Sequence, residues 1–251
     1  MQNAQLLTKS ILPLGFRPSP GSLLFNELNQ DEAAAVYALH ASKRRSERDA
    51  QLIRAGDPAA PLLTIISGWA FRYGLLSNGR RQILSVNLPG DTIGLDTLLT
   101  GAPAYPVQCA GAVTYCVIDR DRAAALAREA PWFRRRALEA LARDRAAAET
   151  AITRLGQCNA EERVASVFLD LYERLADRGL AGNNSFTLEL TQLHLADLVG
   201  LTAVHFNRVL KRLVARGLLS VAGHRVTLLN MSSLECLAPL PRSFAVAQFA
   251  S

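Results

Sequence analysis

The 251-residue sequence has few cysteines and no long apolar run. Its four cysteines are widely spaced and form no Cys-x-x-Cys pair: Cys109, Cys116, Cys158 and Cys236. This spacing indicates neither a disulfide framework nor a zinc ribbon and favours buried free thiols. No apolar stretch has the length of a membrane span. Residues 1–20 lack the ordered basic, apolar and cleavage regions of a signal peptide. We therefore expect a cytoplasmic protein with no membrane segment.

The motifs of common enzyme classes are also missing. The chain contains no Gly-x-Ser-x-Gly elbow, no Walker phosphate loop and no His-Glu-x-x-His. Its four histidines are scattered along the sequence: His40, His194, His205 and His224. We therefore expect that the protein is not an enzyme.

Acidic residues are absent from one segment near the C-terminus. Lys and Arg exceed Asp and Glu by 28 − 22 = 6 over the whole chain, which permits nucleic acid as a partner without proving it. The stretch GLTAVHFNRVLKRL, residues 200–213, is rich in hydrogen-bond donors and has no acid. It is either a solvated basic face or a helix that inserts into something negatively charged.

The N-terminal half has the texture of a β domain. Residues 51–119 alternate short apolar runs with Gly, Pro, Asn and Asp, and Asn78-Gly79 is a strong hairpin signal. Several short strands at regular spacing predict an antiparallel barrel or sandwich. A short helix is expected before it, from Asp31 to about His40.

Residues 121–155 contain no glycine and a single proline, Pro131, and this predicts a long helix. A heptad seam runs along it through Leu138, Leu141, Arg145, Ala148, Ile152 and Leu155. The helix either packs on its own barrel or pairs with a second copy in a parallel dimer. In the dimer, which we expect to form through the Asp121–Leu155 helix, Arg145 would mark the register. Gly156 is expected to end the helix, and Asn159 with Glu162 forms a capping box for the next one.

Residues 192–211, QLHLADLVGLTAVHFNRVLK, have the pattern of a helix-turn-helix. Ala196 is small where two helices cross, Gly200 allows a positive φ in the turn, and Thr202 can cap the second helix. The stretch LLSVAGHRVTLLN that follows Gly217 predicts a hairpin with Ala222-Gly223 at or near its turn. A helix-turn-helix followed by a hairpin is a winged helix.

The order of barrel, long helix, helix-turn-helix and wing resembles the CRP/FNR superfamily of bacterial transcription regulators. The similarity extends over about residues 25–230 and rests on LIRAGDPAAPLLTIISGWAFRY, LPGDTIGLDTLL, ERVASVFLDL and LTQLHLADLVGLTAVHFNRVLKRL. It implies an α+β protein with an N-terminal antiparallel, jelly-roll-like β-roll sensor domain, a long dimerisation helix and a C-terminal winged helix-turn-helix domain. The implied segments are an arm (1–25), the β-roll (26–120), the dimerisation helix (121–156), the DNA-binding domain (157–230) and a tail (231–251).

The resemblance further implies a regulator that binds an inverted-repeat operator in double-stranded DNA as a homodimer, with RNA polymerase as a further partner. Arg208 matches an arginine shared by most members and is expected to donate to guanine O6 and N7. Asn207 is a candidate reader of adenine. Ala203 and Val204 replace the polar readers of the best-known relatives and can meet only a thymine methyl. Phosphate contacts are expected from Thr202, His205, Lys211 and Arg212; a solvated helix end is the alternative for the last two.

The sensor domain departs from the cyclic-nucleotide binders of the family. Those carry a Gly-Glu pair and, some ten residues later, an Arg followed by Ser or Thr. Here Gly94 is followed by Leu95, Asp96 is one residue out of register, and AYPVQ at residues 104–108 supplies no cation. Burying a cyclic phosphate without a cation is unfavourable, so we expect no useful affinity for cAMP or cGMP. The candidate effector-pocket residues are Gly94, Leu95, Asp96, Tyr105 and Pro106, and the effector is unknown.

No cofactor is expected either. An oxygen-sensing iron–sulfur cluster is disfavoured because no cysteine precedes Cys109. Cys109 and Cys116 are expected to share a strand or hairpin as core thiols, with a redox pair as the alternative. The alternative function is a cyclic-nucleotide-binding-like regulatory protein that responds to a small effector without direct DNA readout.

Overall fold

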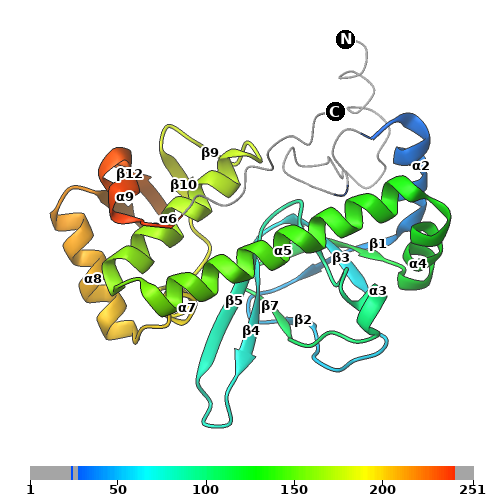
Figure 1. Ribbon diagram of the computed structural model, residues 1–251, viewed down its shortest axis with the longest axis horizontal. Helices are drawn as coiled ribbons and strands as arrows, with labels where there is room; N and C mark the ends of the chain where they lie inside the picture. Colours follow the sequence, from blue (N-terminus) through cyan, green and yellow to red (C-terminus); the bar gives the residue numbers. More distant parts are fainter. Residues whose placement is uncertain (1–23, 25–27, 241–251) are drawn as a thin grey trace. The chain divides into compact units, whose positions relative to one another are not determined.

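The computed structural model describes residue 24 and residues 28–240 (Figure 1). The described residues form two compact units: those up to residue 70 together with 87–140, and residues 71–86 together with 141–240. The predicted N-terminal arm, apart from Leu24, and the tail beyond residue 240 lie outside the described residues. No helix in the described part of the chain is long and apolar enough to cross a membrane.

The first unit contains strands of two antiparallel β-sheets. The expected short helix, α2 (Gln30–Leu39), precedes them. The larger sheet has the order β1-β8-β3-β6, with β1 (His40–Ser46), β8 (Val113–Ile118), β3 (Leu62–Ser67) and β6 (Thr92–Ile93). In the other sheet β2 (Gln51–Ile53) pairs with β7 (Val107–Cys109). The core of this unit is made of inward-facing apolar side chains, among them Ile53, Leu63, Ile65, Ile93, Val107 and Val113. The predicted antiparallel β domain is confirmed.

Gly68 allows two segments of the first unit to approach each other closely. Its φ is +81°, and a Cβ at this position would lie 2.1 Å from the backbone oxygen of Ala112. Any side chain here would both strain the backbone and collide with a carbonyl group that cannot move aside. The approach of the chain after β3 to the segment before β8 therefore requires glycine.

The predicted Asn78-Gly79 hairpin lies mainly in the second unit. It joins β4 (Ala70–Leu75) to β5 (Arg81–Asn87), and Gly79 has a φ of +81°. The amide of Gly79 donates to the carbonyl oxygen of Leu76 at 2.9 Å, which closes the turn.

Two helices occupy the segment where one long helix was predicted. They are α4 (Arg120–Glu129) and α5 (Pro131–Gln157). Between them Ala130 is extended, with φ −110° and ψ 102°, because a residue before proline disfavours the α conformation. The candidate dimerisation helix therefore begins at Pro131 rather than Asp121. It also continues through Gly156 instead of ending there.

The C-terminal part of the second unit is the predicted winged helix. Its elements are α6 (Ala160–Ala176), β9 (Ala181–Gly182), β10 (Ser185–Thr187), α7 (Gln192–Val199), α8 (Ala203–Ala215), β11 (Leu219–Ala222), β12 (Arg225–Leu228) and α9 (Met231–Leu237). The strands form one sheet of order β11-β12-β10-β9. The capping box of Asn159 and Glu162 at the start of α6 is confirmed. Helix α9 packs against α6 and buries Leu234, so the domain extends past the expected boundary at residue 230.

Candidate nucleic-acid interface

The two helices of the motif are joined as the sequence predicts. Gly200 follows α7 in the left-handed conformation, with φ 66° and ψ 39°, a conformation that glycine adopts without steric cost. The side chain of Thr202 then accepts from the amide of His205 at 3.2 Å and caps α8. The apolar side chains that fix the two helices together are buried: Leu195, Ala196, Val199, Phe206, Val209, Leu210 and Leu213.

The opposite face of α8 is exposed and basic. Val204 has 71% of its surface accessible, and Ala203 beside it is partly buried. Arg208 and Lys211 are exposed, and neither side chain has a hydrogen bond or ion pair within the described residues. Their donors are therefore available to an outside acceptor, and Arg208 retains both the charge and the fork geometry needed for a guanine.

Thr202 can cap the helix and contact a phosphate at the same time. Its oxygen accepts the amide hydrogen of His205, while the hydroxyl hydrogen remains available to donate. Both side chains are exposed at the first turn of α8. The amide groups of a helix N-terminus also favour a nearby anion.

Asn207 is less accessible than its place in the sequence implies. It is partly buried, and its Oδ1 is buried without a hydrogen-bond partner in the part of the chain that the structure describes. A bidentate contact to adenine requires both amide atoms, so the side chain must rotate before it can read this base.

Arg212 has an acidic partner that the sequence did not reveal. Its Nε lies 3.1 Å from Oε1 of Glu161, and Nη1 of Arg216 lies 2.8 Å from Oε2 of the same carboxylate. Glu161 comes from the first turn of α6. Residues 161 and 216 are 55 positions apart, and no local pattern indicates such a pair. The basic stretch is therefore partly neutralised from a neighbouring helix.

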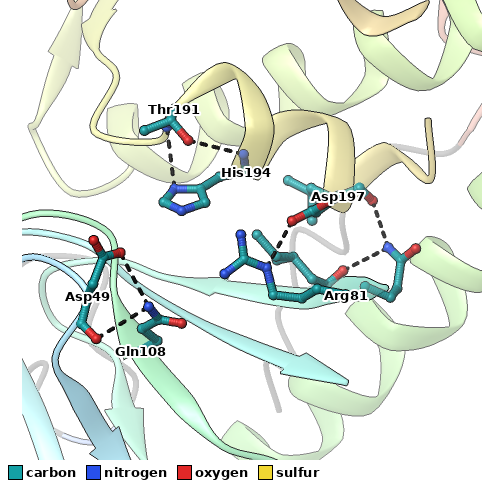
Figure 2. Close-up of polar contacts among 9 residues, drawn as sticks. Asp49, Arg81, Gln108, Thr191, His194 and Asp197 are labelled. Atoms are coloured by element: carbon teal, nitrogen blue, oxygen red, sulfur yellow. Dashed lines mark hydrogen bonds and ion pairs between the residues drawn. The ribbon is translucent and has the colours of Figure 1, made fainter. Parts of the chain in front are cut away.

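The first helix of the motif is bound by the β4–β5 hairpin, as Figure 2 shows. Nε of Arg81 donates to Oδ2 of Asp197 at 2.8 Å, and both side chains are less than one-fifth exposed. The guanidinium of Arg81 also lies over the ring of Phe71, 5.1 Å from its centroid, a favourable cation–π arrangement. Gln82 adds a hydrogen bond from its Nε2 to the carbonyl oxygen of Leu198 at 3.2 Å.

The hairpin also contacts α7 through a pair of aromatic rings. The rings of Phe71 and His194 are 4.7 Å apart, and both residues are buried. The amide of Thr191 donates to Nδ1 of His194 at 3.4 Å, and its hydroxyl accepts from the amide of His194 (Figure 2). His194 thus serves as the third residue of the α7 capping box and as packing for the hairpin.

The candidate effector residues are in the first unit. Gly94 has a φ of +93°, Leu95 is buried, and Asp96 precedes the short helix α3 (Thr97–Thr100) without a side-chain capping bond. Tyr105 is 47% exposed and Pro106 is partly buried.

A cation that the sequence reading missed reaches this segment. Arg120, from the first turn of α4, donates to the carbonyl oxygens of Thr97 at 2.9 Å and Pro58 at 2.6 Å. Arg120 is 23 residues from Thr97, so spacing alone gives no sign of the contact. Both terminal nitrogens of the guanidinium already have protein acceptors.

A winged helix with a donor-rich second helix, together with an antiparallel β domain, defines a DNA-binding regulator with a sensor-like domain. Two family models match the chain: a cyclic nucleotide-binding domain over residues 43–130 and a Crp-like helix-turn-helix domain over residues 162–237. The chain belongs to the CRP/FNR superfamily of transcription regulators. It is a DNA-binding transcription regulator and not an enzyme.

Named relatives support the family along most of the chain. The sequence is 30% identical over 207 residues to an anaerobic regulatory protein of Aggregatibacter actinomycetemcomitans, covering 82% of this chain and 80% of the relative. It is 28% identical over 218 residues to the fumarate and nitrate reduction regulatory protein of Escherichia coli, covering 87% of each chain. The structure of FixK2 from Bradyrhizobium japonicum matches with a TM-score of 0.71 and 25% identity, covering 80% of this chain and 98% of FixK2.

The sensor positions of this chain differ at one buried residue from the family's cyclic-nucleotide pattern. A buried leucine, Leu95, stands where a carboxylate would bind the ribose. Arg120 is the cation found at this segment, and it is already held by carbonyl groups. Those two contacts use one N–H from each terminal nitrogen, so the guanidinium keeps its charge and its other donors.

The cysteines do not fit a metal cluster. Cys109 and Cys116 lie in strands β7 and β8 of different sheets, so the expectation of a shared strand or hairpin was wrong. Burial, reinforced by Asp49 and Glu47, raises the pKa of the Cys109 thiol to about 11, which keeps it protonated at neutral pH. The described residues contain no group of three or more His, Cys, Asp or Glu able to hold a metal.

Proposed function

We propose that this regulator acts in the cytoplasm as a homodimer on an inverted-repeat operator, with Arg208 reading one guanine in each half-site. The observation that supports this most directly is the accessible and unpartnered Arg208 guanidinium on an exposed helix face whose other side is buried. Thr202, His205 and Lys211 lie on the exposed part of α8 as well, and phosphate contacts by such groups would fix the position of the helix in the major groove.

The homodimer is proposed on the exposed apolar side chains of α5. Leu138 is 54% exposed and Ile152 is 69% exposed, and their separation of 152 − 138 = 14 residues is two heptads. Arg145, on the same seam, is exposed and forms an ion pair with Glu149 within its own helix. Pairing with a second α5 would bury the apolar positions and leave Arg145 to define the register.

The dimer fixes the expected operator geometry. Two recognition helices entering successive major grooves require half-sites separated by about 34 Å, or roughly 10–10.5 bp from centre to centre. Contacts with RNA polymerase would follow when the dimer is bound beside a promoter. An effector would act by rotating the DNA-binding domains through α5 as rigid bodies.

The effector is proposed to be neither cAMP nor an iron–sulfur cluster. The buried Leu95 supports the first exclusion, and the burial of Cys109 and Cys116 in separate sheets supports the second. Gly94, Leu95, Asp96, Tyr105 and Pro106 remain the residues at which an effector of other chemistry would bind. Isothermal calorimetry showing micromolar cAMP affinity would contradict this proposal.

Selection of bound DNA from genomic fragments tests the reading role of Arg208. Arg208→Ala should weaken operator binding by about 1–3 kcal/mol and relax the preference at one base pair of each half-site. Lys211→Ala is the matched control, because it should weaken binding to all sequences equally and reduce the salt slope by about 1. A uniform loss in Arg208→Ala would assign this residue to the phosphate backbone instead. If the wild type selects no site at all, the protein responds to an effector without direct DNA readout.

A further inference from the structure

Glu161 is the acidic residue that faces the C-terminal half of the recognition helix. Each of its two carboxylate oxygens lies beside one arginine: Oε1 is 3.1 Å from Nε of Arg212 in α8, and Oε2 accepts a hydrogen bond from Nη1 of Arg216, the C-cap residue of α8, at 2.8 Å. The Glu161 side chain is 24% exposed, so it is largely covered. The side chains of Arg212 and Arg216 are 52% and 53% exposed. One acid is therefore shared by two bases one helical turn apart.

The position of Glu161 is fixed by its own helix. Its amide donates to Oδ1 of Asn159 at 3.0 Å within the capping box of α6. A carboxylate in the first turn of a helix is also favoured by the helix dipole. The two arginines, at i and i+4, would repel each other without it.

The charge on α8 is consequently uneven. Arg208 and Lys211 have no partner within the described residues, whereas Arg212 and Arg216 share one negative charge. The formal charge of the second pair with its glutamate is +1 rather than +2. Because non-specific affinity comes from neutralised phosphates, this half of the helix contributes less to binding of arbitrary sequences than its arginine content implies.

We infer that Glu161 is a specificity-determining residue that weakens phosphate binding by Arg212 and Arg216 and so makes affinity depend more on base contacts. The inference rests on the proposed DNA-binding function. It also changes the expected role of Arg212, whose phosphate contact must compete with an internal carboxylate. In Glu161→Gln the side chain keeps its size while the competing charge is removed.

The test compares wild type and Glu161→Gln on a selected operator and on an unrelated duplex of equal length, across a range of salt concentrations. We expect tighter binding of Glu161→Gln to the unrelated duplex at low salt. The slope of log K against log salt should become more negative by about 0.9 for each additional phosphate neutralised. The ratio of specific to non-specific affinity should fall.

Two controls separate this effect from general charge and from folding. Glu47→Gln makes the same change of net charge at an exposed glutamate paired with Arg45, and it should leave both affinities unchanged. Glu161→Gln placed in an Arg212→Ala, Arg216→Ala background should have no further effect on the salt slope, because the two bases it acts on are gone.

The outcomes distinguish the inference from the function on which it rests. If the wild type binds its operator but Glu161→Gln keeps the wild-type slope and non-specific affinity, the inference fails and the DNA-binding function stands. A loss of affinity in Glu161→Gln would also overturn it, because the glutamate would then orient the arginines for phosphate rather than compete for them. A wild type that binds no duplex refutes the function itself.

Discussion

The ion pair between Arg81 and Asp197 should hold α7 against the hairpin, and a double-mutant cycle can measure how strongly. The atoms are 2.8 Å apart and the side chains are 19% and 18% exposed. Fully exposed pairs contribute about 0.2–1 kcal/mol, and removing one partner of a fully buried pair costs about 3–5 kcal/mol. With this intermediate exposure, we expect Asp197→Asn or Arg81→Gln to cost about 1–2 kcal/mol.

Hydrogen exchange of the α7 amides is the appropriate assay, because a protein with two compact units need not unfold in a single step. A loss of 1–2 kcal/mol corresponds to amide exchange that is roughly 5–30 times faster where local opening controls the rate. The double variant should cost less than the sum of the single variants, since the interaction can be lost only once.

Arg80→Gln provides the matched control within the same hairpin. Arg80 is exposed and its side chain contacts Asn78 in the turn, so its replacement should leave α7 exchange unchanged. Strictly additive effects of Arg81→Gln and Asp197→Asn would show that the two charges do not interact and that the hairpin is held by its other contacts, the aromatic ones and the Gln82 hydrogen bond.

Three further predictions concern packing, thiols and assembly. Gly68→Ala should destabilise the first unit by more than about 3 kcal/mol in chemical denaturation, because backbone strain and the 2.1 Å collision act together. Gly56→Ala, with φ +74° and no atom within 4 Å of the added Cβ, should cost only about 1 kcal/mol; equal costs would refute the collision. At pH 8 a thiol reagent should label the exposed Cys236 rapidly and leave Cys109, with its raised pKa, unlabelled until the protein unfolds. Ile152→Glu should convert the proposed dimer to a monomer in sedimentation, and an unchanged mass would exclude the α5 seam as the interface.

The local parts of the fold could be predicted because their signals lie within a few residues. Gly200 provides the left-handed turn, Thr202 caps α8, and Asn159 with Glu162 caps α6. Each of these contacts spans three positions or fewer, so the residue types alone indicate the geometry. The exposed, basic face of α8 was predicted from the spacing of its apolar residues.

The contacts that tie distant segments together could not be predicted in this way. Arg81 and Asp197 are 116 residues apart, and the shared carboxylate of Glu161 is 55 residues from Arg216. In the sequence, each of these charged residues looks like an ordinary surface residue, and only folding brings the partners together. The break at Ala130 was different, because its signal is local. The residue before a proline disfavours the α conformation, and the prediction of one long helix did not treat Pro131 as a boundary.

The compact unit that contains the winged helix is not a continuous segment of sequence. The hairpin strands that contact α7 come from residues 71–86, whereas the rest of that unit begins at residue 141. A truncated protein that starts at the beginning of α6 would leave Asp197 without its guanidinium and His194 without the ring of Phe71. An excised DNA-binding fragment should therefore be less stable than the same residues in the intact chain, and supplying the hairpin through a short engineered linker should restore what truncation removes.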